Sequence, residues 1–266
     1  MPTRFTWLRA AGAATLLAAG LALGGCGDAF PDYHYKMTIY AGGKAFSSVR
    51  GIEQERVSSL ADSSGSRVKT TLSGEAVIMD LNGRTYYALL SKPDRPEYAA
   101  GVAGLALRPH VPGEKPLGEV DRAIEEYNES QQGRSPTAYL DDQASANQAM
   151  VEVAGPKDLP RTEPNTDPYR GPRSFDSWPM FVTFSDPRDP KSVREVSPES
   201  IGVSRITIEI TNEDVTTGIE ERLAWLVKFK TSSSRLSGNR SIVVSNTDRS
   251  LAENLGIGAF LIKKKK

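Results

Sequence analysis

The chain has 266 residues, with 33 basic and 33 acidic side chains, so its formal net charge is zero at pH 7. This balance argues against a nucleic-acid binder, and 38% hydrophobic with 25% charged residues fits a globular protein with polar loops. The single cysteine, Cys26, excludes an intramolecular disulfide and a zinc site built on several thiolates.

The first 25 residues have the three parts of a secretory signal peptide. Arg4 and Arg9 make the start basic, residues 10–23 form an apolar run, and two glycines follow. The run is too short to cross a bilayer as a helix, which takes about 20 apolar residues. We therefore predict an exported protein whose signal peptide spans residues 1–25.

The sequence Leu23-Gly24-Gly25-Cys26 resembles the lipobox of bacterial lipoproteins. This resemblance implies signal cleavage between Gly25 and Cys26 and acylation of the Cys26 thiol with fatty acids such as palmitate. Each buried CH₂ contributes about 0.8 kcal/mol, so two or three acyl chains anchor a protein firmly. The alternative is an ordinary cleaved signal followed by a chance cysteine.

The residues after Cys26 bear on which membrane holds the protein. In Gram-negative lipoproteins an Asp directly after the lipidated Cys retains the protein in the inner membrane. Here that position is Gly27, and Asp28 comes one later. The analogy favours the outer membrane and a periplasm-facing protein, joined to its anchor by a tether at residues 26–32.

Residues 33–91 carry strong strand signals. Apolar and polar residues alternate over 33–41, which predicts that Tyr33, Tyr35, Met37 and Ile39 share one face. Glycine-containing turns at 42–43 and 82–83 predict two tight hairpins. Together with strands expected at 46–52, 68–72, 75–81 and 84–91, they predict one antiparallel meander of four or five strands.

Residues 92–176 differ, because they hold 11 of the chain's 17 prolines. Proline removes a backbone donor and fixes φ, so we expect mostly irregular structure there. Two islands, 98–107 and 117–131, predict helices. The stretch 156–173 is expected to be either mobile or laid over the surface.

Residues 177–262 return to regular structure. Strict alternation over 205–211 predicts a strand with Ile206, Ile208 and Ile210 inward. Further strands are expected at 180–184, 192–196 and 241–245, with a turn at 185–190. An amphipathic helix is expected at 217–226, with a Thr217 cap and with Ile219, Leu223 and Leu226 facing the core.

These elements predict an α+β fold of mostly antiparallel strands. The two β-rich segments, 33–91 and 177–262, are expected to share one core in a single domain over 33–262, with the proline-rich segment 92–176 wrapped over it. A basic tail follows at 263–266.

Several phrases resemble a family of exported lipoproteins of unknown function, chiefly from alphaproteobacteria. The resemblance covers both ordered regions and implies an exported, lipid-anchored protein with no assigned activity. The matching phrases are Tyr35-Lys36-Met37-Thr38, Gly74-Glu75-Ala76-Val77, residues 186–193, residues 210–226 and Leu251-Ala252-Glu253-Asn254-Leu255.

The two histidines, His34 and His110, offer little for catalysis. Ser-His-Asp chemistry needs a histidine beside an activated serine, and no G-x-S-x-G elbow is present. No phosphate-binding glycine loop is present either. We interpret both histidines as structural or solvated, and we assign no catalytic, cofactor or metal residue.

Three charged stretches remain as candidates. Asp186 and Asp189 could present oxygens to a cation, but Asp and Pro at these spacings are more typical of a plain turn. Residues 212–222 place polar groups at a strand-to-helix junction, where either an anion or simple helix capping is expected. The lysines at 263–266 could contact anionic lipid or cell-wall polymer, or be solvated.

The sequence thus predicts a lipid-anchored cell-envelope protein with a non-catalytic binding or structural role. Its expected partners are the membrane, through Cys26, and an envelope protein or cell-wall component. The alternative is a periplasmic hydrolase that uses paired carboxylates.

Overall fold

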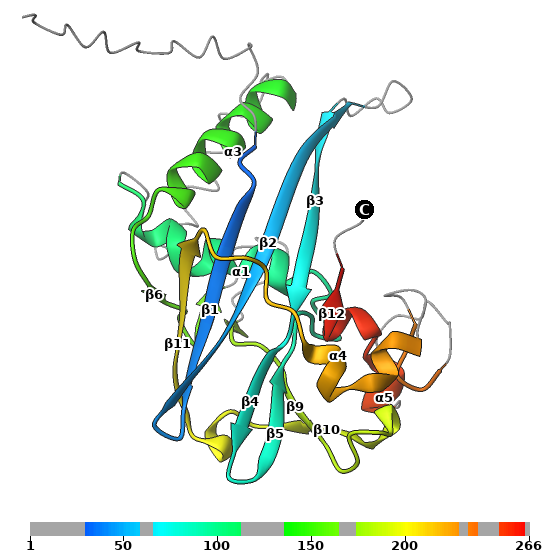
Figure 1. Ribbon diagram of the computed structural model, residues 1–266. Coiled ribbons are helices and arrows are strands. Elements are labelled where there is room, and N and C mark those ends of the chain that lie inside the picture. The colour runs from blue at the N-terminus through cyan, green and yellow to red at the C-terminus, as the bar shows by residue number, and fades with distance from the viewer. Residues whose placement is uncertain are drawn as a thin grey trace, which may run out of the picture.

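The computed structural model describes residues 30–58, 66–112, 136–164, 174–228, 234–238 and 250–263. Figure 1 shows an α+β fold of mostly antiparallel strands, which confirms the predicted fold class. The signal peptide, Cys26, the helix expected at 117–131 and the strand expected at 241–245 lie outside the described residues.

The larger sheet joins strands from both β-rich segments in the order β12-β3-β2-β1-β11-β6. The predicted hairpin at Gly42-Gly43 joins its first two strands, and both glycines have positive φ. Tyr35, Met37 and Ile39 are buried, as their alternation predicts. The strands are β1 (Tyr33–Ala41), β2 (Lys44–Ser58), β3 (Ser66–Glu75), β6 (Lys157–Asp158), β11 (Val203–Thr211) and β12 (Leu261–Ile262).

The smaller sheet has the order β10-β9-β5-β4 and again mixes the two segments. Its strands are β4 (Val77–Leu81), β5 (Arg84–Ala88), β9 (Phe181–Phe184) and β10 (Val193–Val196). The β4–β5 hairpin turns on Asn82-Gly83, where φ is 51° and 75°, as the two-residue hairpin signal predicts.

The single meander predicted for residues 33–91 is therefore wrong. β3 and β4 follow one another in the chain but belong to different sheets. The change occurs at Gly74, whose φ of +139° is accessible to glycine and strained for other residues. The segments on both sides of Gly74 have strand-like sequences, so hydropathy alone does not show that they belong to different sheets.

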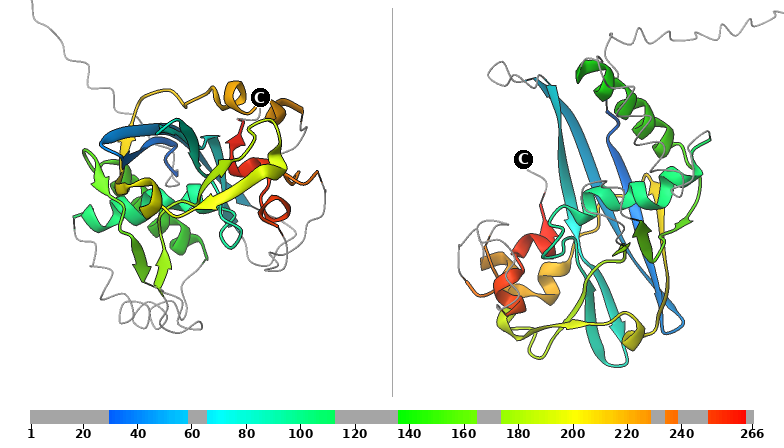
Figure 2. Two further views of the ribbon diagram at one scale, coloured as in Figure 1. Left: turned by 90° about the horizontal axis from the view of Figure 1, so that it is seen from below. Right: turned by 180° about the vertical axis from the view of Figure 1, so that it is seen from behind.

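Helix α1 (Tyr98–Leu107) has the bounds that the sequence predicts. It lies on the inner face of the larger sheet, as the view from behind in Figure 2 shows. Six of its residues are buried, including Tyr98 and Leu107.

Helix α3 (Pro136–Val151) contradicts the expectation that 92–176 is irregular outside the two islands. Among residues 141–151 of this helix, Ala144, Asn147 and Met150 are buried, so the described part of its packed face is small and partly polar. Polar contacts complete the docking: Arg56 pairs with Asp141 at 2.8 Å, and the Asn147 amide donates to Gln54. A face of this kind produces little apolar periodicity, and only Pro136 at the first helical position marks the start.

Shorter elements connect and cover the sheets. The 156–173 stretch is partly laid on the fold, since β6 pairs with β11. The predicted turn at 185–190 and strand at 192–196 are both present. The remaining elements are η1 (Arg108–His110), β7 (Thr162–Pro164), β8 (Ser174–Asp176), η3 (Pro190–Ser192), η4 (Glu199–Ile201), α4 (Ile219–Arg222), η5 (Ala224–Lys228), α5 (Leu251–Asn254) and η6 (Ile257–Ala259).

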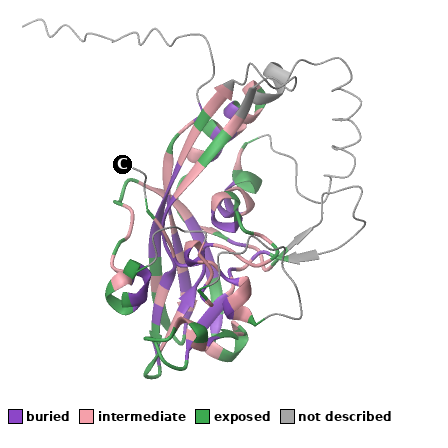
Figure 3. Cartoon of the chain, turned by 90° about the vertical axis from the view of Figure 1, so that its right-hand side faces the viewer, coloured by how far each residue is buried: buried purple, intermediate pink, exposed green. Residues whose placement is uncertain are grey.

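The smaller sheet has apolar residues packed on both of its faces. One face, with Met79 and Phe181, packs in a core with the larger sheet and α1. The other face, with Tyr87 and Phe184, packs in a second core with Trp225 and the C-terminal helices. The buried residues in Figure 3 run along the strands between these layers.

Arg50 is fully buried on the inner face of β2, where the two sheets separate. Its Nη1 donates to the Tyr35 hydroxyl at 3.3 Å, and that hydroxyl donates to the carbonyl of Ala99 in α1. The Tyr98 hydroxyl donates to the carbonyl of Ser177 at 2.9 Å. These bonds tie the larger sheet to α1, and α1 to the chain that enters β9.

We predict that Tyr98→Phe lowers the free energy of unfolding by about 1–2 kcal/mol, because it leaves the buried Ser177 carbonyl without its donor. Urea unfolding measures the change. Tyr86→Phe is the control, since the Tyr86 hydroxyl has no hydrogen-bond partner in the described part of the chain, and it is expected to change stability little. Equal effects of the two substitutions would contradict this role of Tyr98.

Candidate functional site

A segment with no regular secondary structure, residues 212–218, crosses the outer face of the larger sheet from the end of β11 to α4 (Figure 1). We call it the crossing segment. Thr216 holds its middle: the Thr216 N–H donates to the carbonyl of Val49 at 3.0 Å, and the Val49 N–H donates to Thr216 Oγ1 at 2.8 Å. These bonds use the edge of β2 beyond the point where β3 leaves the sheet.

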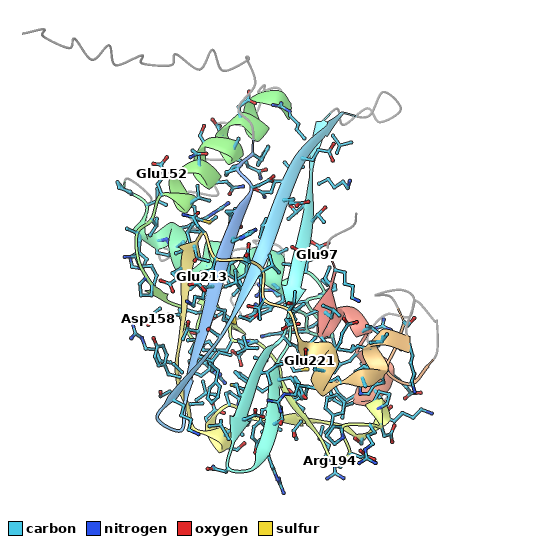
Figure 4. All side chains as sticks on the ribbon, viewed as in Figure 1. Glu97, Glu152, Asp158, Arg194, Glu213 and Glu221 are labelled. Carbon is cyan, nitrogen blue, oxygen red and sulfur yellow. The ribbon has the colours of Figure 1, made fainter. Side chains whose placement is uncertain are left out.

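Glu213, labelled in Figure 4, fixes the first part of the crossing segment twice. Its carboxylate pairs with Lys36 Nζ at 2.6 Å, and this hydrogen bond raises the pKa of Lys36. Its backbone carbonyl accepts a hydrogen bond from His34 Nδ1 at 2.8 Å. Because a carbonyl only accepts, Nδ1 carries a proton in this bond, and in the neutral form of the ring Nε2 is then the acceptor.

Glu75 fixes the far end of the crossing segment. It is buried, and its Oε2 accepts the backbone N–H of Ile219, the first residue of α4, at 2.9 Å. Burial raises the pKa of the Glu75 carboxyl group, while the hydrogen bond from Ile219 lowers it by less. The predicted Thr217 cap is wrong: the N-cap is Gly218 without a side-chain bond, and Glu75 supplies the acceptor from another strand.

Beneath and beside the crossing segment lies a hollow of about 540 Å³. We call it the Gly51 hollow. Its wall combines the start of β1, the middle of β2, the end of β3, and the residues that follow β11. The polar side chains of its described lining belong to Asp32, Tyr33, His34, Glu53, Ser73, Thr211, Asn212 and Asp214.

Gly51 forms the floor of the hollow between His34 on β1 and Ser73 on β3, its direct partners in the two ladders. A Cβ at this position would lie 2.7 Å from Ser73 Oγ, 3.3 Å from His34 Cδ2 and 3.2 Å from Val215 Cγ2. The three side chains therefore lean over the glycine. An added methyl group would occupy the space in which they meet.

Ser73 is the polar side chain closest to Gly51 in the hollow. The residue is 8% exposed, and its hydroxyl has no hydrogen-bond partner among the described residues. Its Oγ is not one of the buried side-chain atoms that lack a partner, so the hydroxyl keeps contact with the open space of the hollow. Ser73 Oγ and His34 Nε2 are thus two acceptors at the floor of the same hollow.

The electrostatic character of the hollow is acidic. Asp32, Glu53 and Asp214 line it, and the described residues of its lining include no lysine or arginine. One Asp32 oxygen accepts the backbone N–H of Gln54 at 2.8 Å, which fixes that carboxylate at the entrance of β1. Across the described ranges, no three His, Cys, Asp or Glu residues are placed to hold a metal ion.

The histidines and aspartates considered in the sequence analysis lie in different parts of the structure. His34 enters the hollow, which the structural interpretation of this residue did not anticipate. His110 is exposed on η1, beside α1 on the other face of the sheet. Asp186 and Asp189 accept the backbone N–H groups of Arg188 and Lys191 at 2.9 Å each, as a plain turn requires.

The strand-to-helix junction at 212–222 divides in two. Asn212 and Asp214 line the hollow, whereas the N–H at the start of α4 bonds the chain's own Glu75 and is not left for an external anion. Of the basic tail, Lys263 pairs with Glu220 at 2.8 Å, and residues 264–266 lie outside the described residues.

Sequence reasoning did not identify Gly51, Ser73, Asp32 or Glu53. One signal was present: an isolated glycine inside a strand pattern marks a close approach of other groups. Which groups approach it depends on the registers of two neighbouring strands, and these are set by pairing far along the chain.

Comparison with family models, curated proteins and solved structures finds no match for this chain. The resemblance to an exported lipoprotein family therefore stays a prediction. Within the described residues, no helix is both long and apolar enough to cross a membrane.

We predict that Gly51→Ala lowers the free energy of unfolding by about 1–3 kcal/mol, because the new methyl group overpacks the space shared by Ser73, His34 and Val215. Adding Ser73→Ala removes the closest contact and is expected to restore part of the loss, as a double-mutant cycle in urea would measure. Gly101→Ala, where the methyl group meets nothing within 4 Å, is the control and is expected to be neutral or stabilising. Additive effects at positions 51 and 73 would contradict the packing.

We also predict a pH-dependent effect of Glu75→Gln. The folded-state pKa of Glu75 is raised, so its contribution to stability is full below the unfolded pKa of about 4.3 and is lost as pH rises through the folded value. Gln keeps an acceptor for Ile219 without the charge. The unfolding free energy of the unchanged protein minus that of the variant should fall as the pH rises above about 4. A difference that stays constant with pH would contradict the raised pKa of Glu75.

Proposed function

We propose that the protein is a lipid-anchored, periplasm-facing protein of the bacterial cell envelope that binds a ligand without catalysis in the Gly51 hollow. The observation that carries the binding role is the hollow itself. It has the volume of a small-molecule site, about 540 Å³, and convergent acceptors over a glycine floor.

The acceptors stand on a rigid support. His34, Gly51 and Ser73 are side by side in three paired strands, and Glu213 fixes the His34 ring from the crossing segment. Groups held in this way lose little conformational freedom when a ligand binds.

The carboxylates support binding more than hydrolysis. A glycoside hydrolase places an acid with a raised pKa across the site from a second carboxylate. In this protein Glu75 has the raised pKa, but it accepts the Ile219 N–H and is not part of the lining of the hollow. Its role is to hold α4, so the hydrolase is the weaker proposal.

The anchor rests on the sequence around Cys26. Phe30, four residues later, is buried in a small cluster with Ala144 of α3 and close to Val68 of β3. Four residues span at most about 14 Å, so an acylated Cys26 would hold this end of the molecule beside the membrane. Gly27 after the cysteine favours the outer membrane over the inner one.

Intact mass and membrane fractionation of the protein beside its Cys26→Ser variant test the anchor. We expect the unchanged protein to lose residues 1–25, to carry fatty acyl mass and to sediment with membranes, because thioether-linked lipid and an acylated amine insert in the bilayer. The variant is expected to remain unprocessed. A soluble, unmodified wild-type protein would refute the anchor.

A further inference from the structure

We propose that the buried Arg50 guanidinium is the cation of an internal site for a small monovalent anion of the chloride class, held by Nε–H and Nη2–H where the two sheets separate. The site is distinct from the Gly51 hollow, because Arg50 lies on the inner face of β2 beside Tyr35 and is not among the residues that line the hollow. The inference therefore goes beyond the proposed function and does not depend on it.

The first observation is a charge in the protein interior without a counter-charge. Arg50 is 0% exposed, and no carboxylate pairs with it in the described part of the chain. The Tyr35 ring, with its centroid 5.8 Å from the guanidinium carbon, offers only a weak attraction. Removing an unpaired charge from water is strongly unfavourable, so an anion buried with Arg50 would offset this cost.

The second observation is a pair of N–H donors that lack an acceptor. Nη1 donates to the Tyr35 hydroxyl at 3.3 Å, whereas Nε and Nη2 are buried and have no hydrogen-bond partner. In a planar guanidinium, the Nε–H and Nη2–H groups lie on the same edge and point in nearly the same direction. Such a fork fits a single anion, and buried donors of this kind call for an unseen ion or water.

The hydroxyl groups near Arg50 do not supply the missing acceptors. The Tyr35 hydroxyl accepts Nη1 and donates to the Ala99 carbonyl at 2.5 Å. The Tyr98 hydroxyl donates to the Ser177 carbonyl at 2.9 Å. Burial raises the pKa of Tyr98, and the Arg50 charge lowers it by less, so the two groups are close enough to interact. Both tyrosines are already used to hold α1, and neither bonds Nε or Nη2.

The packing around Arg50 selects a small anion. Gly74 passes over the arginine stem, with its Cβ position 3.0 Å from Arg50 Cγ. Protein interiors contain few voids larger than a water molecule. A halide ion, little larger than water, suits such a place better than an organic acid does. Because the unfolded chain has no such site, the bound ion would stabilise the folded protein by mass action.

Urea unfolding of the full-length protein in non-ionic detergent tests the site, since urea is uncharged. Sodium chloride replaces sodium gluconate at constant ionic strength, because gluconate is too large for the space beside Arg50. As chloride rises from about 1 to about 200 mM, the unfolding equilibrium constant should fall about 10-fold and level off, as for an ion of about 20 mM dissociation constant that binds only the folded state. Bromide should replace chloride.

Two variants show whether Arg50 is responsible. Arg50→Met removes the charge and the donors, and it should abolish the chloride dependence. Arg194→Met is the matched control, since Arg194 is exposed on β10 (labelled in Figure 4), and it should keep the full dependence. An unchanged protein that does not respond to chloride, as expected if water fills the site, would overturn the proposal. So would an equal response of the unchanged protein and Arg50→Met, which would indicate a general salt effect.

A second measurement needs no variant and applies even if Arg50→Met does not fold. Nuclear magnetic resonance in slightly acidic buffer follows the arginine Nε–H groups of the unchanged protein during the same titration. We expect the Arg50 Nε–H resonance to shift with chloride and bromide and to saturate, while that of Arg194 stays in place. An Arg50 resonance that does not respond would overturn the anion site. Either result leaves the Gly51 hollow open to its own test, because no residue of its lining is changed.

Discussion

A buried guanidinium is the constraint on which the two sheets depend. The Arg50 guanidinium is a buried charge, and no carboxylate pairs with it in the described part of the chain. The Tyr35 hydroxyl and ring offset part of the cost of burying this charge, while Nε and Nη2 have no described partner. Gly74 passes directly over the arginine stem, with its Cβ position 3.0 Å from Arg50 Cγ, so the chain can bend from one sheet to the other only with a glycine there.

That bend creates the conditions for the hollow. Because β3 leaves the larger sheet after Gly74, the edge of β2 at Val49 is free to bond Thr216 of the crossing segment. Glu75, the residue after the bend, turns to the outer face and fixes the start of α4. The bend at Gly74, which divides the two sheets, therefore also provides the contacts that hold the crossing segment. The bend at Gly74 allows the two sheets to pack on the inner face, and it also positions the crossing segment that forms one wall of the Gly51 hollow on the outer face.

Local sequence patterns predicted many of the strands, turns and helices, because these elements are determined by interactions between residues that are near one another in the chain. The alternation at Tyr35, Met37 and Ile39, the hairpin at Asn82-Gly83 and the helix at 98–107 needed no distant partner to be recognised. Helix α3 was missed because Ala144 and Asn147 dock it through a small, partly polar face that produces no stripe. The hollow was missed for a different reason: His34, Gly51 and Ser73 look ordinary in the sequence, and only the registers of β1, β2 and β3 bring them together.

The central claim is that the hollow presents hydrogen-bond acceptors at its floor, and the state of the His34 ring tests it most directly. Nitrogen chemical shifts of the His34 side chain, recorded at about pH 8 where an ordinary histidine is neutral, distinguish the two tautomers. Our account predicts a proton on Nδ1, bonded to the Glu213 carbonyl, and a bare Nε2 facing the hollow. A proton on Nε2 instead would remove both the bond to the crossing segment and the acceptor for a ligand, and would contradict the account.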